Sequence, residues 1–205
     1  MGDYKAPKLD KVRVAMIGVG ARGSGHVKQL EAIEGTEIVA ISDLYEDLVD
    51  RSVKNCESVG DGRHQNIKRF FGEENQWKEM LKTVKPDAVF IATNWKNHAP
   101  MAIEAMKQGA HAFVEVPLAL TLEEMWDIVD TSERTQKHCM MMENVNYGRD
   151  ELLYRGISTV GSGKFLAKRH HARHRGLVRF NKRSCLLVSG SGSRSVILAE
   201  LTRGF

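Results

Sequence analysis

A glycine-rich turn at residues 18–23, Gly-Val-Gly-Ala-Arg-Gly, constrains the fold more than any other feature of this chain. It follows a short apolar run at residues 12–17 and precedes a segment in which apolar residues recur at helical spacing. Gly18 permits a tight turn out of a strand, Gly20 lets the backbone approach a diphosphate, and Gly23 lets a helix pack on the strand. The turn therefore predicts a strand, a phosphate-binding loop and a helix in succession.

An acidic residue follows at the spacing that this type of loop requires. Asp43 lies 20 residues beyond Gly23, at the end of a second apolar run at residues 37–42. A carboxylate there accepts hydrogen bonds from the adenosine ribose hydroxyls of a dinucleotide. It would repel the 2′-phosphate of NADP, so the predicted cofactor is NAD. The alternative is a glycine turn followed by a helix-capping aspartate.

Strands and helices alternate through the first three quarters of the chain. Helical spacing separates six short apolar or extended runs, at residues 12–17, 37–42, around 70–71, 87–93, 111–115 and 138–143. Such alternation is typical of βαβ units with a parallel sheet. The predicted fold class is α/β, a Rossmann doubly wound parallel sheet.

The segment after residue 120 predicts a well-defined helix. Thr121 and Glu124 have the spacing of a capping box. Leu122, Met125, Trp126 and Val129 then recur on one helical face, and we expect this face, Trp126 included, to pack against the core. We expect the methionine run at residues 140–142 to be a buried strand and not a metal site.

Charge divides the chain near residue 154. Residues 155–205 contain 11 Lys and Arg and a single acid, Glu200, a net charge of +10, which leaves −6 for residues 1–154. Hydrophobic periodicity is weak in the basic segment. We expect an NAD-binding domain at residues 1–154 and a basic, poorly ordered tail at residues 155–205.

Composition excludes several classes of protein. Hydrophobic residues make up 42% and charged residues 27% of the chain, values typical of globular proteins. No apolar run is long enough to cross a bilayer, and the start has no apolar stretch of signal-peptide type. The three cysteines are scattered, and the three histidines at 170, 171 and 174 lie among bases that would repel a cation. We therefore expect no metal site, no membrane partner and a cytoplasmic location.

Several motifs resemble one known family. The run at residues 14–23, the run at 87–93 with His98 after it, and the triplet at 115–117 resemble the Gfo/Idh/MocA oxidoreductase superfamily. The pieces at 21–22, 95–98, 115–116, 120–126 and 143–150 more narrowly resemble glycoside hydrolase family 109, the NAD-dependent α-N-acetylgalactosaminidase-like enzymes. The resemblance runs from about residue 11 to about residue 154 and stops at the basic tail.

The resemblance implies a set of cofactor contacts. Besides the three glycines and Asp43, it assigns to NAD the residues Ala21, Arg22, Trp95, Lys96, Asn97, His98, Glu115, Val116 and Asn144. Three alternatives stay open: Glu115 as a helix-capping or salt-bridging carboxylate, His98 as a helix cap, and Arg22 as a solvated helix residue. The catalytic residues are unknown, because the family's tyrosines and histidines lie in its C-terminal substrate domain.

The resemblance also suggests a reaction. Family 109 enzymes are thought to oxidise the sugar transiently at C3, eliminate the glycoside, add water and return the hydride. Dehydrogenases of the superfamily carry Glu-Lys-Pro where this chain has Glu115, Val116 and Pro117, so the missing lysine favours the glycosidase branch. An NAD-dependent sugar dehydrogenase and a nucleic-acid-binding module using the basic tail remain the alternatives.

The usual α+β substrate domain is not recognisable in this chain. Fifty-one residues are too few for its large sheet and the surrounding helices. We hypothesise that residues 155–205 arise from a frameshift or a truncation. Such a chain would bind NAD without being active alone, and apolar surface left uncovered would favour a homo-oligomer.

Overall fold

The computed structural model describes residues 5–58 and 62–143. Six strands alternate with five helices along the chain in this part of the protein. The strands are β1 (Val12–Ile17), β2 (Thr36–Ser42), β3 (Lys68–Phe70), β4 (Ala88–Ile91), β5 (His111–Glu115) and β6 (Cys139–Met142). The helices are α1 (Gly23–Glu31), α2 (Glu46–Glu57), α3 (Gln76–Val84), α4 (Trp95–Lys107) and α5 (Leu122–Thr135).

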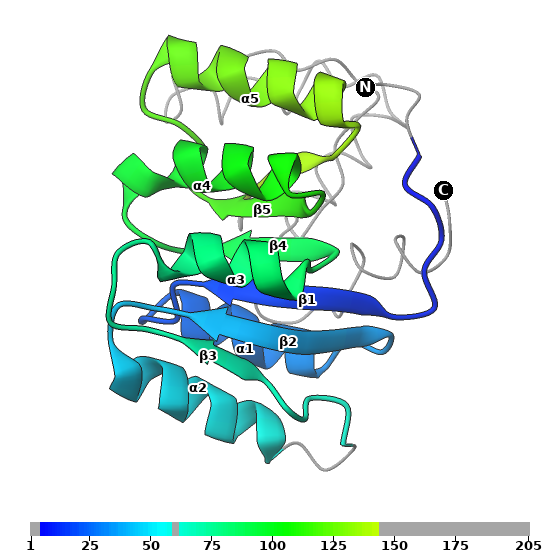
Figure 1. The fold of residues 1–205 in the computed structure, drawn as a ribbon, viewed down its shortest axis with the longest axis vertical. Coiled ribbons are helices and arrows are strands. Elements are labelled where there is room, and N and C mark those ends of the chain that lie inside the picture. Colours follow the sequence, from blue (N-terminus) through cyan, green and yellow to red (C-terminus); the bar gives the residue numbers. More distant parts are fainter. Residues whose placement is uncertain (1–4, 59–61, 144–205) are drawn as a thin grey trace, which may run out of the picture. The chain divides into compact units, whose positions relative to one another are not determined.

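The strands form a single parallel sheet in the order β3-β2-β1-β4-β5-β6. Figure 1 shows α3 and α4 in front of the sheet and α1 behind it. Strands β2 and β3 are added on one side of β1, and strands β4 to β6 on its other side. The position between β1 and β4 is therefore a topological switch point, where ligands bind in open α/β folds. The predicted fold class, a Rossmann doubly wound sheet, is confirmed.

Strand alternation places two groups of side chains on opposite faces of the sheet. Val89 and Ile91 of β4 belong to the apolar cluster that the helices α3 and α4 cover. Phe90 and Phe113 lie on the other face, paired across β4 and β5, with their rings stacked at a centroid distance of 4.7 Å. Because Glu115 follows Phe113 by two residues in β5, its side chain emerges on that second face as well.

The predicted start of α5 is confirmed. The Thr121 hydroxyl accepts a hydrogen bond from the Glu124 amide, and the Glu124 carboxylate accepts one from the Thr121 amide, each at 3.2 Å. This reciprocal pair satisfies amide groups that the first turn of a helix leaves unpaired.

The predicted core face of α5 is wrong. Leu122 is 64% exposed and Trp126 61% exposed, and Met125 and Val129 are exposed too, whereas Ile128 is only 4% exposed. The helix packs beside α4 through a narrow face that contains Ile128 and Thr131. The apolar stripe lies on another side of the helix, so its spacing indicated a helix but not the side that is covered.

The burial of the edge strand β6 also differs from the prediction. The run at residues 140–142 does form a strand, but Met141 is 42% exposed and only Met142 is buried. In the described part of the chain β6 pairs only with β5, and an edge strand exposes more side-chain surface than a central one. Asn144, the boundary near residue 154 and the basic segment at 155–205 lie outside the described residues.

Candidate dinucleotide site

The turn between β1 and α1 is built by its first and third glycines. Gly18 has a φ of +85°, and a Cβ atom there would come within 2.5 Å of the carbonyl oxygen of Ala92. A Cβ atom on Gly23 would collide with the backbone of Gly18. These two glycines therefore bring the turn close to the end of β4 and the helix close to the turn.

Gly20 differs from its two neighbours. Its φ is not positive, and a Cβ atom on Gly20 would have no atom of the described residues within 4 Å. No contact with the described part of this chain explains a glycine at this position. A ligand that approaches the backbone here would explain it, and this is the place of the pyrophosphate in dinucleotide-binding turns.

The first turn of α1 is open to an anion. Among the described residues, the side chain of the N-cap residue Arg22 makes no capping hydrogen bond, and the first turn contains no acidic residue. Its amide groups and the positive end of the helix dipole consequently favour a negatively charged ligand. The open space at Gly20 and this helix start together fit a pyrophosphate.

Asp43 lies beside the glycine turn, as predicted. Its Oδ2 atom accepts a hydrogen bond of 2.7 Å from the Val19 amide, and its Oδ1 atom accepts one of 3.2 Å from the Tyr45 amide. Each carboxylate oxygen has two lone pairs, so Asp43 can still accept hydrogen bonds from ribose hydroxyls. The same residue thus fixes the turn and remains able to bind a ligand.

More negative charge lies next to Asp43. Glu46 and Asp47 are in the first turn of α2, where an unblocked helix start would attract a phosphate. They border a hollow at the carboxyl end of β2 that is also lined by Leu44, Tyr45, Asp50, Phe71 and Gly72. This acidic rim disfavours a 2′-phosphate more strongly than Asp43 would alone.

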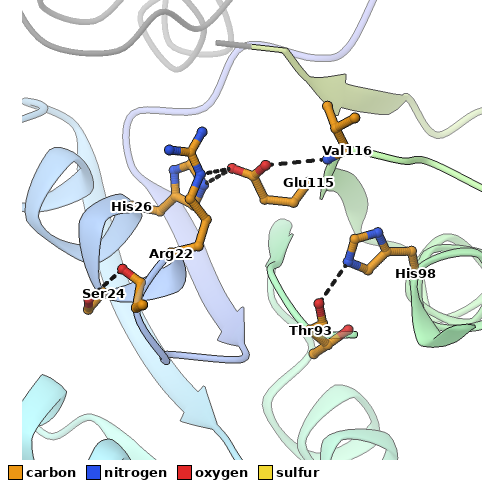
Figure 2. Close-up of polar contacts among 8 residues, drawn as sticks. Arg22, Ser24, His26, Thr93, His98, Glu115 and Val116 are labelled. Carbon is orange, nitrogen blue, oxygen red and sulfur yellow. Dashed lines mark hydrogen bonds and ion pairs between the residues drawn. The ribbon is translucent and has the colours of Figure 1, made fainter. Parts of the chain in front are cut away.

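The opposite side of the switch point carries an ion-pair cluster. The Nε atom of Arg22 lies 2.7 Å from Oε1 of Glu115, and the Nε2 atom of His26 lies 2.6 Å from the same oxygen. Figure 2 shows both side chains converging from α1 on the carboxylate at the end of β5. Burial alone would raise the pKa of Glu115, but hydrogen bonds from Arg22 and His26, reinforced by their charges, hold it below its ordinary value.

The loop after β4 divides into exposed and buried residues. Trp95 is 63% exposed and Lys96 is also exposed, whereas Asn97 is half-buried and His98 is fully buried. The ring nitrogens of His98 lie 2.7 Å from the Pro117 carbonyl oxygen and 3.1 Å from the Thr93 carbonyl oxygen. His98 therefore links the loops after β4 and β5 and presents neither nitrogen to the surface.

The predicted site residues form a continuous edge of the sheet. Gly18, Gly20, Ala21, Arg22 and Gly23 make the turn, with Asp43 on its β2 side and Glu115 across β4. Val116 is exposed next to Glu115, and the residues at 95–98 begin α4 between these points. Only Asn144 lies outside the described residues. His26 was not predicted, because its partner Glu115 is distant in the sequence and no local pattern connects the two residues.

Metal ligands and membrane-spanning helices are both absent from the described residues. These residues contain no group of three or more side chains arranged to hold a metal ion. None of their helices has the length and apolar character needed to cross a bilayer. Cys56 and Cys139 are both free thiols in this part of the chain.

A parallel sheet with a glycine turn, an uncapped helix start and an acidic residue at the end of β2 defines a dinucleotide-binding domain of the Rossmann type. Residues 12–143 match the model of the Gfo/Idh/MocA oxidoreductase family, described as an NAD-binding Rossmann fold. The match covers more than half of the chain, and the protein belongs to this family.

Curated relatives agree with the narrower resemblance. The chain is 56% identical over 154 residues to glycosyl hydrolase family 109 protein 1 of Akkermansia muciniphila, a match that covers 75% of this chain and 31% of the relative. It is 52% identical over 160 residues to a Shewanella oneidensis protein named alpha-N-acetylgalactosaminidase, covering 78% and 34% respectively. The chain thus spans about a third of the length of these relatives.

Solved structures share the fold at low sequence identity. The WlbA dehydrogenase of Chromobacterium violaceum, crystallised with NADH and UDP-GlcNAcA, matches with a TM-score of 0.64 at 19% identity, over 75% of this chain and 41% of that one. Scyllo-inositol dehydrogenase of Lactobacillus casei, crystallised with NAD(H) and scyllo-inositol, matches with a TM-score of 0.59 at 18% identity, over 73% and 40%. These likenesses support the fold described above.

Proposed function

We propose that the chain binds NAD across the carboxyl edge of its sheet, with the pyrophosphate at the glycine turn. The observation that carries this proposal is the open space at Gly20 beside an uncapped α1. Asp43 would accept hydrogen bonds from the adenosine ribose, and Glu115 would lie toward the nicotinamide end. Trp95, Lys96, Asn97, Val116 and Asn144 complete the proposed contacts. His98 links the loops after β4 and β5, which carry the first four of them.

Equilibrium titration of the purified chain with NAD and with NADP tests this proposal. We expect saturable NAD binding and weaker NADP binding, because Asp43 and the acidic start of α2 oppose a 2′-phosphate. A folded chain that binds neither nucleotide would refute the proposal. Tighter binding of NADP would refute the assignment of Asp43.

For the full-length context we propose the glycosidase branch of the family. Support comes from the 56% identity to a family 109 relative and from Val116, which stands where superfamily dehydrogenases have a lysine. Bound NAD would supply a transient hydride acceptor for the sugar. The described residues would contribute binding and orientation of that cofactor, and the sugar-binding groups would come from the remaining two thirds of the relatives' length.

The second candidate is an NAD-dependent sugar dehydrogenase. It is favoured by the fold shared with scyllo-inositol dehydrogenase. Net accumulation of NADH with a sugar substrate would support this candidate, whereas release of a sugar from a glycoside without net NADH would support the glycosidase. Both assays require a protein extended to the length of the relatives, made by joining residues 1–154 to a relative's C-terminal portion.

The remaining predictions concern the whole chain. Translating the coding DNA in the other frames tests the frameshift hypothesis for residues 155–205, since a family-like continuation in another frame would support it. Nucleic-acid binding by these residues stays an alternative that we do not expect, and a homo-oligomer stays a prediction. A reducing cytoplasm suits the free thiols of Cys56 and Cys139.

A further inference from the structure

One buried ion-pair partner has no role in the site as proposed so far. His26 lies in the middle of α1, and its side chain is only 10% exposed. Its ring rests near Phe90, with the ring centroids 6.4 Å apart and a tilt of 49°. Phe90 of β4 in turn stacks on Phe113 of the neighbouring strand β5. The ring that lies next to the imidazole is thus itself held in place by a second strand.

The two partners of Glu115 differ in their surroundings. Arg22 has a side chain that is 54% exposed, whereas both His26 and Glu115 are almost buried. Holding an exposed guanidinium in one place costs side-chain entropy, and its ion pair is weakened by the surrounding water. A buried group therefore gains more from the same ion pair. Arg22 is therefore the exposed and more weakly held partner of the carboxylate, and His26 is the buried one.

Both partners use the same oxygen of Glu115. Arg22 and His26 both contact Oε1. The other oxygen, Oε2, has a single long contact among the described residues, with the Val116 amide at 3.3 Å. This leaves Oε2 as the atom with spare capacity to accept a hydrogen bond from a ligand hydroxyl.

We propose that His26 is a positioning residue, which holds Oε1 of Glu115 so that Oε2 is fixed for a ribose hydroxyl of the bound nucleotide. The proposal rests on the proposed NAD site. The imidazole acts by donating from Nε2, which carries a proton both in the imidazolium and in one tautomer of the neutral ring. Arg22 is then free to turn toward the pyrophosphate without releasing the carboxylate.

The first test compares NAD dissociation constants of four chains. His26→Gln keeps an amide donor near the position of Nε2, whereas His26→Ala removes the donor. We expect His26→Ala to bind NAD about tenfold more weakly, which corresponds to about 1.4 kcal/mol, and His26→Gln to recover most of that loss. The matched control is His111→Gln, a buried histidine at the opposite end of β5, which should leave NAD affinity unchanged.

A second readout separates positioning from general destabilisation. The ionisation of Glu115, followed by carboxyl NMR in the chain without nucleotide, should shift to higher pH in His26→Ala and return toward the original value in His26→Gln. The charged groups that face Glu115 among the described residues are Arg22 and His26, so removing one leaves the other as the remaining cation. Loss of fold alone would not produce rescue by glutamine.

The outcomes are distinguishable. Weaker NAD binding and a raised Glu115 ionisation in His26→Ala, both recovered by glutamine, support the proposal. Unchanged NAD affinity in a folded His26→Ala chain overturns it while the NAD site stands. An original chain that binds no NAD refutes the NAD site, and an unchanged Glu115 ionisation in His26→Ala would then overturn the positioning role independently.

Discussion

Alanine at two positions of the glycine turn should separate folding from binding. Gly18→Ala forces a side chain into a backbone conformation with a φ of +85° and brings its Cβ to 2.5 Å from the Ala92 carbonyl oxygen. The left-handed conformation alone costs alanine about 1–2 kcal/mol. For a chain of this size about 2–4 °C is lost per kcal/mol, so Tm should fall by about 2–8 °C before the steric contact is counted.

Gly20→Ala should have the opposite profile. Its Cβ meets no atom within 4 Å in the part of the chain that the structure describes, and its φ is not positive. Alanine in a compatible conformation restricts the unfolded chain and stabilises by about 0.4–1 kcal/mol, so Tm should stay the same or rise slightly. The added methyl group would stand where the pyrophosphate approaches, and NAD affinity should fall at least about tenfold, equivalent to about 1.4 kcal/mol.

Thermal unfolding and NAD titration of the same samples measure both effects. Gly25→Ala is the control, because this exposed glycine of α1 also has open space around its Cβ but lies beyond the turn. It should leave NAD affinity unchanged, and Tm should stay the same or rise slightly, because alanine is compatible with the helical conformation of this position. Gly20→Ala that binds NAD as tightly as the original chain would refute the assignment of the pyrophosphate. Gly20→Ala that unfolds as readily as Gly18→Ala would refute the geometry of the turn.

Three further predictions concern charge and packing. Asp43→Asn keeps an acceptor for the Val19 amide but removes the negative charge. In paired titrations the preference for NAD over NADP should therefore shrink about tenfold. An unchanged preference would show that Asp43 does not set it. In denaturant unfolding, Ile128→Ala should lower the free energy of unfolding by about 2–5 kcal/mol because Ile128 is buried. Trp126→Ala should lower it by less than about 1 kcal/mol because this ring is exposed. Equal losses would mean that the apolar stripe on α5 is covered in solution. Burial first, and then the charges of Lys137 and His138, lower the pKa of His111 to about 4. Between about pH 6.5 and pH 4 the unfolded chain therefore binds an extra proton, and the free energy of unfolding should fall as pH falls through this window. His111→Gln should flatten that part of the curve of stability against pH. A curve that the substitution leaves unchanged would contradict the lowered pKa of His111.

The sequence was sufficient for the fold because its signals are local. The apolar runs bounded by glycine gave the bounds of β1 and β5 correctly. The run at residues 87–93 is longer than the strand it predicts, β4 at Ala88–Ile91, because the ends of an element are set by its hydrogen bonds and a local pattern locates them only approximately. The glycine spacing and Asp43 located the turn for the same local reason.

Contacts between distant residues could not be predicted in the same way. The partner of His26 is Glu115, 89 residues further along the chain, and no spacing rule connects them. The side of α5 that is covered depends on where α4 lies, so the stripe that includes Trp126 predicted a helix but misplaced its buried face. The roles of Arg22 and His98 likewise depended on which carbonyl or carboxylate groups the fold brings close.

Amide NMR during titration with NAD tests the central claim most directly. If the pyrophosphate binds at the start of α1, the amide signals of residues 18–23 should shift most, in a saturable manner, with those near Asp43 and Glu115 following. Shifts confined to α5 and β6, or a folded chain whose spectrum NAD leaves unchanged, would contradict the assignment of this edge of the sheet as the nucleotide site.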